Sequence, residues 1–105
     1  MRTLKKVPVT VEFVSDINID DLKPNIMYIR KDKMYLTHLC FCEDKCFVNL
    51  PISTLTIDGV SKQSDDKGCS WDVEIKNEKI TVKPSILNHP CECHYIITNG
   101  IANIV

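Results

Sequence analysis

Cysteine and histidine side chains are concentrated in two short patches of this 105-residue chain. The first patch, "THLCFCEDKC", contains one histidine and three cysteines, and the second, "HPCECHY", contains two of each. Thiolate and imidazole groups are the ligands of structural Zn²⁺ sites, which two short segments often form together once the chain has folded. The two patches therefore predict one zinc site to which both contribute.

The candidate ligands outnumber the four positions around a tetrahedral zinc ion. The four that we favour on spacing are Cys42, Cys46, Cys91 and His94. Cys40 can take the place of Cys42, because residues i and i+2 of a strand share a face. His38 is interpreted as a buried strand histidine or as a residue that orients a ligand. Cys93 is an alternative ligand if its segment forms a turn.

Other kinds of chemistry fit these residues less well. Cysteines also pack as small apolar residues, but clustering of this kind favours metal over core packing or disulfides by roughly three to one. Glu43, Asp44 and Glu92 lie beside the ligands as possible bases of an open zinc site, and we interpret them as solvated charges. A Rieske-type cluster would need C-x-H, whereas the first patch has H-x-C. Serine–histidine–aspartate catalysis has no supporting motif.

Composition places the chain among ordinary globular proteins. The formal net charge is -1, and 44% of the residues are hydrophobic. Such a balance argues against a nucleic-acid partner, which usually needs a basic face. The chain shows no apolar run of the roughly twenty residues that span a membrane, and its start does not resemble a signal peptide. We therefore expect a cytoplasmic protein with no membrane partner, in which the cysteines stay reduced.

The elements that position the patches are expected to be strands. Alternating residues predict a strand over 7–14, and β-rich runs around Lys31-Asp32 predict a hairpin over 26–41. A short strand over 46–53 is expected to end at Pro51, followed by an exposed loop over 57–70. Two further hairpins are predicted around Asn77-Glu78 and Asn99-Gly100. The prediction is one mainly β domain over 1–105, with roughly six to nine short antiparallel strands and a zinc-knuckle-like site.

The same residues resemble a family of small bacterial proteins that is predicted to bind metal. The family pattern has H-x-C-x-C-G-C-G, then S-L-S-P-S-I, then P-C-x-S-H-Y; here the corresponding stretches are "HLCFCEDKC", "KPSI" and "PCECHY". The loop Glu43-Asp44-Lys45 replaces the family glycines, and Cys93 replaces a serine. The resemblance covers roughly Met27 to the C-terminus and implies an accessory role in a bacterial ubiquitin-like conjugation pathway, in a setting of antiviral defence.

These observations support hypotheses of three classes. The first is a zinc-stabilised module that binds a protein partner, such as a ubiquitin-like modifier or its conjugation enzymes. The second is an enzyme, ligase-like or hydrolytic, that uses an open zinc site or a reactive cysteine, Cys69 or Cys93. The third is a small iron–sulfur redox protein. We expect the first, with zinc as the cofactor.

Overall fold

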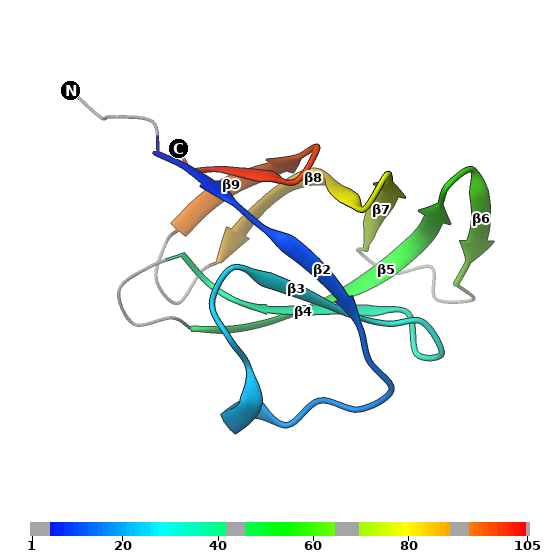
Figure 1. Ribbon diagram of the computed structural model, residues 1–105, viewed down its shortest axis with the longest axis horizontal. Helices are drawn as coiled ribbons and strands as arrows, with labels where there is room; N and C mark the ends of the chain where they lie inside the picture. The colour runs from blue at the N-terminus through cyan, green and yellow to red at the C-terminus, as the bar shows by residue number, and fades with distance from the viewer. Residues whose placement is uncertain (1–4, 42–45, 65–69, 89–92, 105) are drawn as a thin grey trace.

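The computed structural model describes residues 5–41, 46–64, 70–88 and 93–104. Within these ranges the chain forms ten strands and one short 3-10 turn, which confirms a mainly β domain and exceeds the expected six to nine strands (Figure 1). The elements are β1 (Lys5–Pro8), β2 (Thr10–Phe13), η1 (Ile19–Asp21), β3 (Ile26–Arg30), β4 (Tyr35–Leu39), β5 (Phe47–Ile57), β6 (Val60–Gln63), β7 (Trp71–Lys76), β8 (Lys79–Asn88), β9 (Cys93–Thr98) and β10 (Ile101–Ile104).

The strands form one sheet that nearly closes into a barrel. The strand order is β1-β10-β9-β8-β7-β5-β4-β3-β2, and β6 pairs separately with β5. The two strands at the ends of this order are consecutive in the chain and are joined through Val9 (Figure 1). The amide of Val9 donates to the carbonyl of Gly100, and the amide of Thr10 donates to that of Asn25. The continuous segment of β1 and β2 thus pairs first with β10 and then with β3, and in this way it links the two ends of the sheet.

The sequence predicted antiparallel strands, but two of the strand pairs are parallel. The pairs β2–β3 and β5–β7 are parallel. Parallel neighbours are joined by a longer connection than a hairpin. Their pairing therefore leaves no local turn signal in the sequence.

Two tight turns lie where the sequence placed them. Asn77 and Glu78 have φ of 51° and 65°, and Asn99 and Gly100 have φ of 50° and 79°. Positive φ at both central residues is the mark of the turn that matches the twist of a two-residue hairpin. These turns join β7 to β8 and β9 to β10. They fix the register of the strands that carry the second patch.

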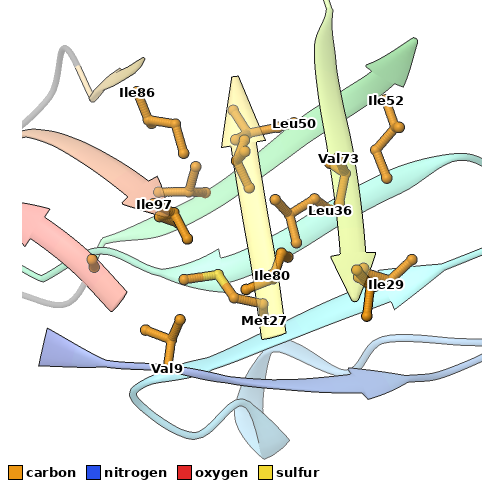
Figure 2. Close-up of a cluster of buried hydrophobic side chains, with 14 of the residues drawn as sticks. Val9, Met27, Ile29, Leu36, Leu50, Ile52, Val73, Ile80, Ile86 and Ile97 are labelled. Carbon is orange, nitrogen blue, oxygen red and sulfur yellow. The ribbon is translucent and has the colours of Figure 1, made fainter. Parts of the chain in front are cut away.

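Side chains from nearly all strands meet in a single apolar core inside the curled sheet. Figure 2 shows Met27, Ile80 and Ile97, from three strands, directed towards the same interior. Each of these three side chains is fully buried, with 0% exposure. Complete burial of an aliphatic side chain of this size contributes about 1.5–3 kcal/mol. The core therefore holds the strands in place around the ends of β4, β5 and β9, where the cysteine patches lie.

Candidate functional site on the β8–β9 ribbon

Strands β8 and β9 form a ribbon with two different faces. Ile86 is paired with Tyr95, and both are buried, whereas the next pair, Leu87 and His94, points to the other side. This follows from the alternation of side chains along a strand. Leu87 is 49% exposed and Ile96, two residues beyond His94, is 41% exposed. We call Ser85, Leu87, His94 and Ile96 the outer patch.

The inner face of this ribbon joins the two cysteine- and histidine-rich patches. Nε2 of His38, on β4, lies 2.5 Å from the hydroxyl of Tyr95, on β9, and the two groups share a hydrogen bond. The rings of Phe41 and Tyr95 pack edge to face, with centroids 4.9 Å apart. Tyr95 follows His94 directly in the chain. Residues 57 positions apart in the sequence thus bring the first patch against the second.

His38 is held in an apolar environment. Its side chain is 1% exposed, and burial lowers its pKa from 6.5 to about 3. The imidazole is therefore neutral at pH 7. Within the described part of the chain, its Nδ1 atom is buried without a hydrogen-bond partner. A buried polar atom without a partner costs stability, and an ordered water molecule or an ion is a common reason for one.

The predicted ligands are only partly placed by the structure. Cys40 is 2% exposed and belongs to the apolar core, and its amide donates to the carbonyl of Cys46 over 2.8 Å. Cys46 and Cys93 are half-buried and pack against the core. Cys42 and Cys91 lie outside the described residues.

The described ranges therefore do not test the predicted zinc site. In residues 5–41, 46–64, 70–88 and 93–104, no three histidine, cysteine, aspartate or glutamate side chains gather as a metal site would require. The favoured set would take two of its ligands, Cys42 and Cys91, from beyond these ranges. Zinc binding stays a prediction.

A serine on β8 lies just before the segment that pairs with His94. The register of β8 against β9 shifts between Val82 and Ile86, so that Ser85 falls within an irregularity of the strand. It is half-buried and stands two residues before Leu87, the cross-strand partner of His94. Irregularities of this type often re-aim a side chain next to an active site.

Sequence reasoning gave Ser85 no chemical role. The signal was present in the "KPSI" element, which precedes the Cys-x-x-His-Tyr element and resembles the family pattern. What the sequence does not show is that β8 and β9 pair so that Leu87, two residues after Ser85, lies opposite His94.

The sequence of the chain matches a known protein family over most of its length. The model of the family described as "Bacterial ubiquitination-like system serine protease (BubE)" matches residues 13–105. The chain belongs to the BubE family. The match to BubE includes both patches, Ser85 and the whole β8–β9 ribbon, and it confirms the expected association with bacterial ubiquitin-like systems. No curated protein and no solved structure matches the chain.

A membrane-spanning helix was not expected. Among the described residues, none of the helical structure has the length and apolar character needed to cross a bilayer.

Proposed function

We propose that the protein is a serine protease of a bacterial ubiquitination-like system, with Ser85 as the nucleophile and His94 as the general base. The observation that carries this proposal is the position of Ser85. It lies in the irregular segment of β8, two residues before the cross-strand partner of the half-buried His94, in a chain that belongs to a family described as serine proteases. A serine hydroxyl is a weak nucleophile until an adjacent base takes its proton.

The chemistry assigns one step to each group. His94 accepts the hydroxyl proton while Oγ of Ser85 forms a bond to the carbonyl carbon of the substrate. The proton then passes from the imidazole to the leaving amine, the peptide bond breaks, and an acyl-serine ester remains. A water molecule, deprotonated by the same imidazole, hydrolyses that ester and restores the hydroxyl.

The irregularity in β8 also supplies a hydrogen-bond donor for the oxyanion that forms during the reaction. Residues in a bulge are not paired in the regular ladder, so their backbone N–H groups are free to bind another acceptor. Pro84 has no N–H, which leaves the amide of Ser85 as the donor beside the nucleophile. A backbone N–H aimed at the oxyanion typically contributes about 10²–10³ in rate. The substrate that we propose is the ubiquitin-like modifier of the same system.

The test is cleavage of that modifier, extended at its C-terminus by a short peptide, together with labelling by a fluorophosphonate probe. Ser85→Ala should abolish labelling and lower the cleavage rate by at least about 10³-fold. Ser53→Ala is the matched control, because Ser53 is also half-buried and lies at a register shift, between β5 and β7. Full activity of Ser85→Ala, or equal loss in Ser53→Ala, would reject the assignment.

A zinc-stabilised, protein-binding module is the second candidate. It is supported by the contact of His38 with Tyr95, which joins the two patches, and by the buried Nδ1 atom that lacks a partner. These features fit a metal site at the junction of β4, β5 and β9. The ligands that would hold zinc come from Cys40, Cys42, Cys46, Cys91 and His94, with His38 and Cys93 as supporting or alternative groups. Zinc would supply folding free energy by ordering these segments.

The two candidates make opposite demands on His94, which cannot be both a zinc ligand and a free base. Elemental analysis of protein purified without a metal-affinity tag decides whether zinc is present. If His94 is a ligand, His94→Gln should lose zinc and melt at a lower temperature. If His94 is the base, the same variant should keep its metal content and its melting temperature while losing cleavage.

A further inference from the structure

A hollow of about 380 Å³ lies between the outer side of β2 and β3 and the connection that joins these two strands. Because β2 and β3 are parallel, the chain leaves the sheet between them and returns, and this connection contains η1 (Figure 1). None of the residues that line the hollow belongs to β8 or β9. The hollow is therefore separate from Ser85 and His94.

Hydrogen bonds hold the connection in place as one wall of the hollow. The side chain of Asn18 accepts a hydrogen bond from the amide of Asp20 over 3.1 Å, and its carbonyl accepts one from the amide of Asp21 over 2.9 Å. Where the connection returns to the sheet, the amide of Lys23 donates to the hydroxyl of Tyr28 over 2.9 Å. A wall that is already ordered reduces the entropic cost of binding a ligand.

The floor of the hollow is apolar. Four aliphatic side chains line it, two from the sheet side and two from the connection, and all four are only half-buried: Val14, Ile26, Ile17 and Leu22. Aliphatic surface that the chain leaves partly uncovered favours a ligand with an aliphatic part.

The rim of the hollow has an excess of negative charge. Three exposed carboxylates and one exposed ammonium group line it: Glu12, Asp16, Asp21 and Lys23. In the described part of the chain none of the three carboxylates forms an ion pair. One ammonium group cannot neutralise three carboxylates, so the rim favours a cation.

The nearest arginine is directed away from this rim. Arg30 follows Tyr28 by two residues on the same side of β3, which makes it a diagonal neighbour of Glu12. Its guanidinium carbon lies 5.3 Å from the centroid of the Tyr35 ring on β4, and its Nη2 donates to Asn49 on β5. Both contacts draw the guanidinium group towards β4 and β5, on the far side of β3 from β2.

The lysines of the turn between β3 and β4 do not neutralise the rim either. The ammonium group of Lys31 lies 4.3 Å from the centroid of the Phe13 ring. Alternation along β2 places Phe13 on the opposite side of the strand from Glu12. Lys33 follows Asp32 in the chain, and neither residue lines the hollow.

A buried hydroxyl group also has unused hydrogen-bonding capacity at the hollow. Tyr28 lines the hollow and is only 7% exposed. A phenol hydroxyl can accept and donate, and in the described part of the chain that of Tyr28 only accepts, from the amide of Lys23. Its proton and its second lone pair are available to a ligand that has both a carbonyl and N–H groups.

We propose that this hollow binds an arginine side chain of an extended peptide segment. The aliphatic stem lies on the apolar floor, and the guanidinium group lies among the carboxylates of the rim. Arginine fits better than lysine, because its planar group has five donors that can bridge two carboxylates and is less strongly hydrated. The site takes no part in bond cleavage and goes beyond the proposed protease function.

The experiment titrates the full-length, ¹⁵N-labelled protein with a capped pentapeptide that has a central arginine between alanines. The arginine peptide should shift amide signals within residues 12–23 and should bind about five- to tenfold more tightly than a peptide with citrulline, the neutral isostere. A lysine peptide should bind more weakly than the arginine peptide. Equal affinity for arginine and citrulline, or for arginine and lysine, would overturn the assignment to arginine.

Variants of the rim test which carboxylates are used. Glu12→Gln combined with Asp21→Asn should lower the affinity for the arginine peptide about fivefold and leave that for the citrulline peptide unchanged. Asp20→Asn is the matched control, because Asp20 is an exposed acid of η1 that does not line the hollow. An equal loss of affinity in the control would mean that only the general negative charge of the region attracts the peptide, which would overturn the site.

The Ser85→Ala variant separates this site from the proposed protease site. It should bind the arginine peptide with the same affinity as the wild type. Loss of binding in Ser85→Ala, or amide shifts confined to β8 and β9, would place the peptide at the protease site and overturn the inference. The absence of shifts within residues 12–23 at millimolar peptide would overturn it as well, whatever the outcome of the cleavage assays.

Discussion

A histidine lies at each face of the β8–β9 ribbon, and the two histidines are in opposite environments. On the inner face His38 is buried against Tyr95, while on the outer face His94 is half-exposed beside Leu87. The buried imidazole is neutral over most of the pH range and is inaccessible to a substrate. The imidazole of His94 is half-buried and lies on the face of the ribbon that is open to solvent. The alternation of His94 and Tyr95 thus separates the buried face of the ribbon from the open face on which we propose that the reaction occurs.

The sharpest test of this division is His94→Gln. Glutamine keeps polar contacts but cannot act as a base, so the rate of modifier cleavage should fall by about 10²–10⁴-fold. The urea midpoint of unfolding should stay within experimental error, because the side chain is partly in solvent. Steady-state kinetics and equilibrium unfolding of the same preparation provide both readouts. A stable variant that retains cleavage would move the base to another residue.

Paired truncations compare what the two faces contribute to the free energy of unfolding. Ile86→Ala removes a side chain that is 1% exposed and should lower the free energy of unfolding by about 2–5 kcal/mol. Leu87→Ala, one residue further on, removes a side chain that is 49% exposed and should cost less than about 1 kcal/mol. Urea denaturation compares the two directly. Equal losses would mean that the outer patch is covered in the folded protein.

The pH dependence of the free energy of unfolding should report the burial of His38 at the inner face. The pKa of His38 is 6.5 when the chain is unfolded and about 3 when it is folded. Between these values the unfolded state binds more protons, so the free energy of unfolding rises with pH, by up to about 1.4 kcal/mol per unit. This contribution of His38 to the free energy of unfolding is complete above pH 6.5 and is lost as the pH falls towards 3. Urea unfolding from pH 4 to 8 should show this slope in the wild type and a smaller slope in His38→Gln.

A smaller effect than that of Ile86→Ala is expected for Tyr95→Phe. This change keeps the aromatic ring and removes the hydroxyl that bonds to Nε2 of His38, so that within the described residues neither ring nitrogen of the buried imidazole has a hydrogen-bond partner. The cost should be about 1–3 kcal/mol. Thermal or urea unfolding measures it, with Tyr35→Phe as the control because Tyr35 is only half-buried on β4. A cost as small as that of the control would show that the hydrogen bond contributes little.

Local patterns were enough to predict some of these elements. The hairpins at Asn77-Glu78 and Asn99-Gly100 were found because their turn residues adopt positive φ, which is a property of a few neighbouring residues. Strand β6 was missed because all four of its residues are exposed, so it has no apolar alternation. Strand β5 was expected to stop at Pro51. It continues because pairing with β4 ends at that residue and pairing with β7 begins at Ile52.

The candidate site was harder to predict because it depends on distant pairing. The histidine and cysteine patches were recognised from composition and were expected to meet at a zinc ion, whereas the contact of His38 with Tyr95 was not predicted. The position of Ser85 was not predicted either, because a single serine has no local signature. Its position gains meaning only from the pairing of β8 with β9, in which Ser85 falls in the register shift and Leu87, two residues further on, lies opposite His94. Strand register over such distances is set by the packed core.

The partner switch at Val9 has a practical consequence for anyone who works with this chain. The BubE match begins at residue 13, after β1 and almost all of β2. A version trimmed to the matched range would strip the covering strand from both β3 and β10. Two bare strand edges invite association between molecules. Recombinant production should therefore retain the first dozen residues, even though sequence comparison alone would treat them as dispensable.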